Sequence, residues 1–239
     1  MPDLLPLFLN VTGRPVALVG GGRVAAGKLQ QLLAAGARVI VVAPAICDAI
    51  RTQAASVEAS RDDAGAPAGV ELRERPFTPS DLDGMWLVVA AATPEVNRSV
   101  AEAADARRLF VNAVDDPANA TAYLSGVVRR DGVTLAISTS GDAPALTSLL
   151  REAIDALLPA DLAAWLWQAR AERVAWRRDQ VPMEERKPRL LRALNALYAP
   201  PPGAAEHAAA GPLPSISTIA SSDRGPDIPW LHAPEDSWL

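Results

Sequence analysis

The chain has 239 residues, of which 49% are hydrophobic and 21% charged, a balance typical of a folded globular protein with a substantial core. Its net charge of -5 gives no support to nucleic-acid binding, and no apolar run approaches the roughly 18 residues that a membrane span needs. The residues after Met1 lack a basic region followed by an apolar stretch, so we expect a cytoplasmic protein that has no membrane partner.

Cysteine and histidine are scarce, and this limits the chemistry that the chain can perform. Cys47 is the only cysteine, which excludes an internal disulfide and a cysteine-held iron–sulfur cluster or zinc finger. Both histidines, His207 and His232, lie in a Pro-rich C-terminal stretch. We therefore predict no resident metal site, and acid–base chemistry in the folded part must use carboxylates, Lys, Tyr or backbone groups.

The first elements in the chain are predicted to be a strand, a glycine turn and a helix. The apolar run Val16–Val19 stops at three glycines, after which apolar residues recur with helical spacing until Gly36. The turn fits the dinucleotide fingerprint G-x-G-x-x-G/A with Gly20, Gly22 and Ala25. Gly20 would make the turn, Gly22 would let the backbone approach a pyrophosphate, and Ala25 would allow close helix–strand packing. Free N–H groups at the helix start could then hold an anion.

A second strand, Ala37–Ala43, completes a strand–helix–strand unit but lacks one expected feature. An NAD site of this type usually carries Asp or Glu about 20 residues after the glycines, to hold the ribose hydroxyls. Here the strand runs into Pro44 without an acid, and Arg38 lies too early to indicate NADP. Either backbone or groups elsewhere hold the ribose, or the site does not take NAD.

The following segments extend the same alternation of strands and helices. Thr93 precedes a helix with three agreeing signals, which are an N-cap hydroxyl, Pro at the first position and an acid in the first turn. We therefore predict an open, Rossmann-like, doubly wound parallel α/β sheet, with ligands at the carboxyl ends of its strands. Asp115 and Asp116 lie at one such end. The remaining predicted elements of this part are a helix over Cys47–Ala59, a loop over 61–69, an edge strand over Val70–Glu74, and buried strands over Trp86–Ala92 and Leu109–Val114.

After Pro117 the pattern changes to a hairpin and then to helices. Two strand-like runs flank Asp131-Gly132, a hairpin turn signal, and pairing with a second copy would cover their edges, so we expect a homodimer. Three helices are predicted over about 144–158, 161–178 and 182–198. The predicted organisation is a Rossmann domain at 1–116, a β-hairpin dimerisation segment at 117–143, a small helical domain at 144–199, and a disordered Pro/Ala/Ser-rich tail at 200–239.

Several of these motifs together resemble the siroheme synthase N-terminal family, in order and at the family's spacing from about Leu4 to about Leu197. The family consists of precorrin-2 dehydrogenases, several of which are also sirohydrochlorin ferrochelatases. The resemblance implies NAD-dependent oxidation of precorrin-2 to sirohydrochlorin, with ferrous iron as a further substrate in bifunctional members. The segments that carry it are Leu5–Leu9, Val19–Lys28, Ala35–Val39, Asn112–Pro117 and Ile137–Pro144.

The resemblance also assigns site residues. The family's essential aspartate falls on Asp115, and a serine that is phosphorylated in the family, near the porphyrinoid site, falls on Ser138. Backbone contacts after the second strand would replace the missing acid. This chain departs from the family in having Arg23 where an acid is common and Gly27 where Arg is usual. The implied cofactor-binding residues, including the glycine turn, are Gly20, Gly21, Gly22, Arg23, Val24, Ala25, Pro44 and Ala45.

Simpler interpretations remain open for the two assigned side chains. The segment Asp115-Asp116-Pro117 is by itself typical of a turn with Asp as a local acceptor; the resemblance favours Asp115 as a general base and leaves Asp116 in the turn. Such a base would take the proton released on dehydrogenation, or pyrrole protons on chelation. Ser138 could instead be a strand-end hydroxyl that bonds the backbone. The alternative functions are another NAD(P) oxidoreductase on this fold and a non-catalytic dinucleotide-sensing protein.

Overall fold

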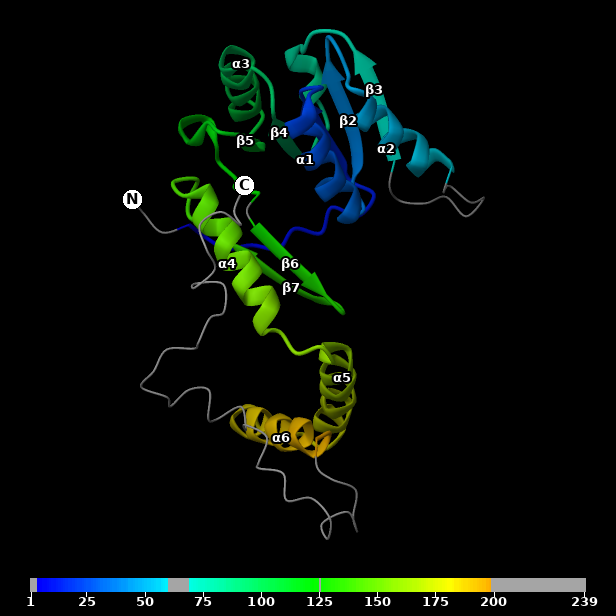
Figure 1. Cartoon of the computed structure of the whole chain (residues 1–239), viewed down its shortest axis with the longest axis vertical. Coiled ribbons are helices and arrows are strands. Elements are labelled where there is room, and N and C mark those ends of the chain that lie inside the picture. Colours follow the sequence, from blue (N-terminus) through cyan, green and yellow to red (C-terminus); the bar gives the residue numbers. More distant parts are fainter. Residues whose placement is uncertain (1–3, 60–68, 125, 199–239) are drawn as a thin grey trace, which may run out of the picture. The chain divides into compact units, whose positions relative to one another are not determined.

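The computed structural model describes residues 4–59, 69–124 and 126–198 (Figure 1). By its internal contacts the chain divides into two compact units, one of Met1–Ser125 with Ser138–Thr147 and the other of Gly126–Ile137 with Ser148–Leu239. The predicted tail at 200–239 and nearly all of the predicted loop at 61–69 lie outside the described residues. The domain boundaries proposed from the sequence therefore stay a prediction.

The first unit contains a five-stranded sheet in the order β3-β2-β1-β4-β5, and every neighbouring pair is parallel. This order confirms the predicted Rossmann-like α/β fold. Successive strands run outward from β1 to one edge and then, after a crossover, from β4 to the other, so a ligand crevice is expected beside β1 and β4. The strands are β1 (Pro15–Val19), β2 (Arg38–Ala43), β3 (Gly69–Glu74), β4 (Leu87–Ala90) and β5 (Phe110–Ala113).

Helices cover both faces of this sheet (Figure 1). One buried cluster joins alternate residues of the central strands, such as Leu18 and Val89, to Leu29 of α1 (Arg23–Ala34) and Ile50 of α2 (Asp48–Ala59). On the opposite face a second cluster includes Val100 of α3 (Pro94–Asp105) and Leu82 of the 3₁₀-helix η1 (Pro79–Leu82). The continuous apolar runs in the sequence arise because residues on both faces of these strands are buried.

Gly27 lies inside α1, where glycine destabilises the helix, and no close contact requires a glycine at this position. A Cβ built at this position would meet nothing within 4 Å. We expect Gly27→Ala to raise the free energy of unfolding by up to about 1 kcal/mol, because alanine loses less backbone entropy in a helix. Urea unfolding followed by circular dichroism measures the change, and an unchanged or lower midpoint would contradict the prediction.

The second unit contains the predicted hairpin, formed by β6 (Gly126–Arg130) and β7 (Val133–Ile137), which pair antiparallel. Asp131 and Gly132 turn the chain with φ of +50° and +83°, the left-handed conformations that a tight hairpin needs. Arg130 at the end of β6 is bound to the helical region: its Nη2 lies 2.7 Å from Asp155 Oδ1, and its Nη1 donates to the carbonyl of Leu158.

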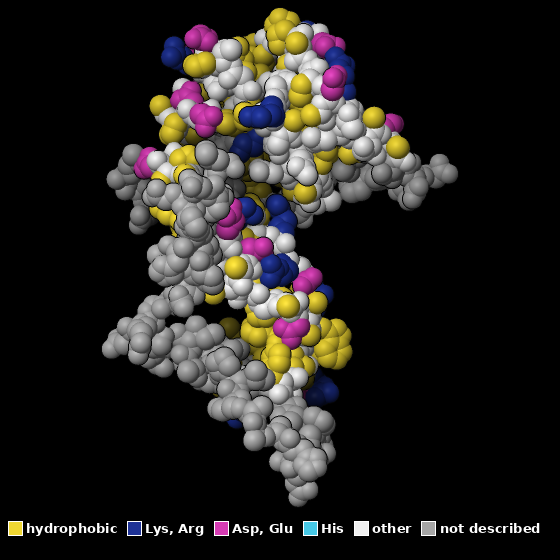
Figure 2. Space-filling view, in the orientation of Figure 1, with side chains coloured by type: hydrophobic (Ala, Val, Ile, Leu, Met, Phe, Trp, Pro, Cys, Tyr) yellow, Lys and Arg dark blue, Asp and Glu magenta, His cyan; other side chains and the backbone are white. Residues whose placement is uncertain are grey.

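The helices after the hairpin are α4 (Pro144–Leu157), α5 (Leu162–Arg178) and α6 (Met183–Ala196). Apolar side chains stay exposed on them: no residue of α4 is buried, and Leu157 is 70% exposed. Figure 2 shows hydrophobic side chains gathered over α5, whose Trp167 is 69% exposed. Among the described residues, no helix combines the length and apolarity needed to cross a membrane.

Candidate functional site

The carboxyl end of β1 turns into α1 through glycines that have no room for a side chain. Gly20 adopts φ = +134°, and a Cβ there would lie 2.7 Å from the carbonyl carbon of Ala91 and closer still to its oxygen. A Cβ at Gly21 would lie 2.9 Å from the Cβ of Ala43 and overlap the carbonyl oxygen of Ala45. The turn is therefore packed between the ends of β2 and β4, and only glycine fits there.

Gly22, by contrast, faces open space. It is the N-cap of α1, and a Cβ built on it would meet nothing within 4 Å. The first N–H groups of a helix have no partner within the helix, and the first turn of α1 carries no acidic side chain. Arg23 and Val24 are exposed beside this opening, while Ala25 is fully buried against the sheet. The arrangement fits a pyrophosphate at the helix N-terminus.

A cavity of about 590 Å³ opens in front of the glycine turn. Its size is within the usual range for small-molecule and cofactor sites. Five predicted cofactor residues line it, namely Gly20, Gly21, Gly22, Pro44 and Ala45. The other lining residues are Val19, Val42, Ala43, Pro76, Phe77, Ala91, Ala92, Thr93, Glu95, Val96 and Ser99.

Two backbone hydrogen bonds hold the end of β2 and the segment after it against the glycine turn. The N–H of Gly20 donates to the carbonyl of Val42 at 2.9 Å, and the N–H of Cys47 donates to the carbonyl of Gly21 at 2.8 Å. Pro44 and Ala45 are thus held at the cavity, as required if backbone there replaces the usual acid. The polar side chains lining the cavity, Thr93, Glu95 and Ser99, come from the other side, at the start of α3, and none is cationic.

Asp115 follows the carboxyl end of β5 in an unusual conformation. Its φ of +56° is in the left-handed region, which Asp tolerates better than most residues and which often marks functional positions. Its side chain is exposed, and it does not line the cavity. The neighbouring Val114 N–H donates to the carbonyl of Ala90, so the residue before Asp115 is anchored to β4.

Lys28 of α1 is a charged neighbour of Asp115 that sequence reasoning missed. Burial lowers the pKa of the Lys28 ammonium, and the nearby charge of Asp115 acts in the opposite direction. The ammonium also donates to the carbonyl of Leu124 at 3.3 Å, which ties α1 to the segment after Asp115. The signal available in the sequence was a lysine on the helix that starts at the glycine turn.

Asp116 takes the local role that the turn interpretation predicts. It is the N-cap of the 3₁₀-helix η2 (Pro117–Asn119), and its Oδ2 accepts a hydrogen bond of 2.8 Å from Asn119 Nδ2. The backbone N–H of Asn119 donates to the Asp116 carbonyl as well. Both bonds stay within the turn, so Asp116 stabilises the loop that carries Asp115.

Ser138 follows β7 in a loop beside this turn. Its exposed hydroxyl oxygen accepts a hydrogen bond of 3.1 Å from the N–H of Ser140, a local bond of the kind that strand-end serines make. Ser140 and Gly141 both have positive φ, +56° and +86°. A Cβ at Gly141 would lie 3.2 Å from Cγ of Pro117, so this loop packs against the turn that contains Asp115 and Asp116.

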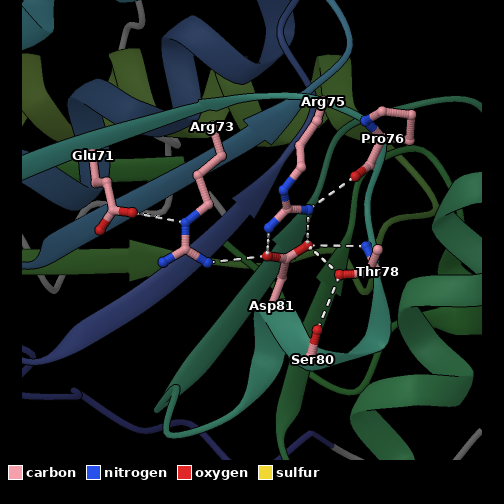
Figure 3. Close-up of polar contacts among 7 residues, drawn as sticks. All are labelled: Glu71, Arg73, Arg75, Pro76, Thr78, Ser80 and Asp81. Atoms are coloured by element: carbon pink, nitrogen blue, oxygen red, sulfur yellow. Dashed lines mark hydrogen bonds and ion pairs between the residues drawn. The ribbon is translucent and has the colours of Figure 1, made fainter.

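A buried carboxylate beyond β3 is a further feature that the sequence analysis missed (Figure 3). Asp81 in η1 is only 2% exposed. Its oxygens accept hydrogen bonds from Arg75 Nη1 and Nη2 at 2.8 and 2.5 Å and from Arg73 Nη1 at 3.0 Å. Thr78 adds its N–H at 2.9 Å and its hydroxyl at 3.1 Å. The capping pattern Thr78-x-x-Asp81 was the one local signal for this cluster.

These donors determine how Asp81 responds to acid. The bond from Arg75, with those from Thr78 and Arg73, holds the pKa of the Asp81 carboxyl well below its usual range although burial opposes this. The unfolded chain therefore takes up a proton below about pH 4 while the folded carboxylate stays ionised, so acid lowers the free energy of unfolding. Between neutral pH and pH values below about 4, we expect the free energy of unfolding to fall less in Asp81→Asn than in the unsubstituted chain. Thermal unfolding at several pH values tests this, and an acid dependence equal to that of the unsubstituted chain would contradict it.

Comparison with known proteins identifies the family. The model of a putative NAD(P)-binding family matches residues 7–126, which is half of the chain. Siroheme synthase 3 of Aeromonas hydrophila subsp. hydrophila is 40% identical over 163 residues, and the match covers 68% of this chain and 32% of that protein. Siroheme synthase of Photorhabdus laumondii subsp. laumondii is 41% identical over 161 residues, covering 67% and 32%. The chain thus spans about a third of the length of these relatives.

A solved structure agrees with the fold. "SirC, precorrin-2 dehydrogenase" superposes with a TM-score of 0.60 at 22% identity, over 82% of this chain and 92% of that chain. The family match supports the NAD(P)-type cofactor that the resemblance implies, and the cradle and cavity described above have the shape to hold a dinucleotide. The family-model match and the siroheme synthase relatives together show that the chain belongs to the siroheme synthase N-terminal family.

Proposed function

We propose that this chain oxidises precorrin-2 to sirohydrochlorin with NAD, as a step in siroheme biosynthesis. The observation that carries the proposal is its 40% identity, over 68% of the chain, to a siroheme synthase. A cavity fit for a dinucleotide, with an exposed carboxylate at the same edge of the sheet, supports it. The carboxylate favours an enzyme over a sensing protein, which would need no acid–base group there.

We assign a role in this reaction to each of the predicted site residues. The turn Gly20–Gly22 and the start of α1 would hold the pyrophosphate, and the backbone of Pro44 and Ala45 would face the adenosine ribose. Bound NAD would supply the hydride acceptor. Asp115 is proposed to accept the proton that leaves precorrin-2, so that each two-electron oxidation releases one hydride and one proton. Ser138, in the neighbouring loop, is proposed as a substrate-binding or regulatory position.

The lining of the cavity favours NAD over NADP. No Lys or Arg is among the described residues that line it. A phosphate on the adenosine ribose, beside Pro44 and Ala45, would therefore find no cationic side chain in this lining. We expect NADP to bind at least about tenfold more weakly than NAD, which corresponds to 1.4 kcal/mol. Isothermal titration with both dinucleotides measures the ratio, and equal affinity would contradict the prediction.

Iron insertion is a second proposed reaction of the same site. Chelation removes two pyrrole protons as ferrous iron enters sirohydrochlorin, and Asp115 is the carboxylate that we propose to receive them. Ferrous iron would be a substrate here, not a resident metal. Adding ferrous iron to anaerobically formed sirohydrochlorin, with and without the protein, tests this: an accelerated conversion to siroheme supports it, and an unchanged rate rejects it.

We also propose a homodimer. The exposed apolar residues of α4, with Leu157 the most exposed, and the edges of the β6–β7 hairpin are surfaces that a second copy would cover. Sedimentation equilibrium over a range of concentrations tests the proposal, and a monomer throughout would reject it. The cytoplasmic location expected from the sequence stays a prediction.

Anaerobic incubation with precorrin-2 and NAD tests the proposed function. We expect NADH and the visible spectrum of sirohydrochlorin to appear together, and neither to appear when NAD is omitted. NAD binding without turnover of precorrin-2 would favour a different substrate or the dinucleotide-sensing alternative.

A further inference from the structure

The Asp81 cluster joins the two ends of a short segment that lines the cavity. Arg75 and Thr78 both donate to the Asp81 carboxylate, and only Pro76 and Phe77 lie between them (Figure 3). Arg75 Nη1 also donates to the carbonyl of Pro76 at 3.0 Å. Pro76 and Phe77 themselves line the cavity. The conformation of this segment, which we call the Pro76–Phe77 wall, is thus fixed from outside the cavity.

The strand order shows which half of the dinucleotide the wall would meet. β3 and β5 form the two edges of the sheet, and the pyrophosphate cradle after β1 lies between them. The two halves of a dinucleotide must therefore extend from the cradle toward opposite edges. Asp115, the proposed base, follows β5, so the nicotinamide half belongs on that side. The Pro76–Phe77 wall follows β3 and faces the adenosine half.

We propose that Asp81 is a positioning residue for cofactor binding: by holding Arg75 and Thr78, it fixes the Pro76–Phe77 wall against which the adenosine half of NAD packs. The aromatic ring of Phe77 and the ring of Pro76 offer an apolar surface of the kind that binds a purine. This inference rests on the proposed use of the cavity for NAD, but not on the identity of the oxidised substrate.

The burial of Asp81 separates this cluster from the ordinary ion pairs around it. Arg51 with Glu74 and Arg107 with Asp83 are also bonded, at 2.6 and 2.8 Å, but the acid of each pair is exposed, by 48% and 65% of its side chain. Exposed pairs of this kind contribute little to a structure. A carboxylate removed from water needs hydrogen-bond donors, and losing it would leave the N–H of Thr78 without its partner and Arg75 with only its bond to the Pro76 carbonyl.

Asp83 provides a matched control, because it lies two residues from Asp81 and pairs with Arg107 away from the wall. The experiment measures dissociation constants of the full chain and its variants for NAD, ADP-ribose and nicotinamide mononucleotide by isothermal titration. We expect Asp81→Asn to weaken NAD and ADP-ribose binding about tenfold each. We expect the affinity for nicotinamide mononucleotide to stay unchanged, and Asp83→Asn to bind all three ligands like the unsubstituted chain.

Two further variants keep the test decisive if Asp81→Asn does not fold. Arg75→Gln leaves Asp81 paired with Arg73, and Phe77→Ala removes the apolar wall itself; both are expected to reproduce the loss of ADP-ribose affinity. Circular dichroism of each variant confirms that it is folded at the temperature of the titration. The inference is overturned if folded Arg75→Gln and Phe77→Ala bind ADP-ribose like the unsubstituted chain, or if affinity for nicotinamide mononucleotide falls equally.

The proposed oxidation of precorrin-2 and the proposed role of Asp81 can be refuted independently. A chain that binds NAD in the pattern above but does not oxidise precorrin-2 would refute the reaction and leave the role of Asp81 intact.

Discussion

Replacing Gly21 with alanine is expected to remove NAD binding almost completely. The added methyl group would overlap the carbonyl oxygen of Ala45 and lie 2.9 Å from the Cβ of Ala43, so the turn or the segment after β2 must move. A misplacement of about 1 Å can cost a reaction about 100-fold in rate, and we expect a loss of NAD affinity of at least the same order. Isothermal titration of the variant with NAD measures the loss, and we also expect a destabilisation of about 1–3 kcal/mol from the overpacking.

Gly27→Ala provides the control for this substitution. It makes the same chemical change in the same glycine-rich segment, but its methyl group would enter open space. We expect it to bind NAD with unchanged affinity. If Gly21→Ala also bound NAD normally, the glycine turn would not be the cradle of the cofactor.

Replacing Asp115 with asparagine is expected to lower the rate of precorrin-2 oxidation by about 10²- to 10⁴-fold, the usual contribution of a general base. Asparagine tolerates the left-handed conformation that Asp115 adopts, so the loop should keep its shape. The dissociation constant for NAD should stay unchanged, because Asp115 does not line the cavity. Single-turnover kinetics with saturating NAD separates the chemical step from cofactor binding.

Asp116→Asn tests whether the effect is specific to the proposed base. The side chain of Asp116 accepts only a local hydrogen bond from Asn119, which asparagine can still satisfy through its amide oxygen. We expect its rate to be close to that of the unsubstituted chain. Equal rates for Asp115→Asn and Asp116→Asn would exclude Asp115 as the base.

The sheet and its helices could be predicted from the sequence because their signals are local. The runs Val16–Val19 and Leu87–Ala90 are apolar throughout, since parallel strands covered on both faces need apolar residues at every position. The turn role of Gly20 could likewise be predicted from the fingerprint, whereas the need for glycine at position 21 arises from contact with Ala43 and Ala45 and could not. The alternating pattern of Val70–Glu74 correctly indicated an edge strand.

Other parts of the site depend on contacts between distant residues. Lys28 and Asp115 are 87 positions apart in the sequence, and no local pattern indicates that they lie close together in the folded chain. In the sequence, Asp81 cannot be distinguished from an ordinary surface acid. Its pairing with Arg73 and Arg75 appears only in the folded structure, after the turn that follows β3. The apolar residues of α4 recur with helical spacing in the sequence, yet none of them is buried within one copy of the chain. Periodicity predicts an apolar face and does not say what covers it.

The most direct test of the account is the stoichiometry of the anaerobic reaction, with NADH and sirohydrochlorin measured in the same sample. We expect one NADH for each sirohydrochlorin formed, and no product of either kind from Gly21→Ala. Sirohydrochlorin formed without an equal amount of NADH, or NAD bound tightly while precorrin-2 stays unchanged, would contradict it.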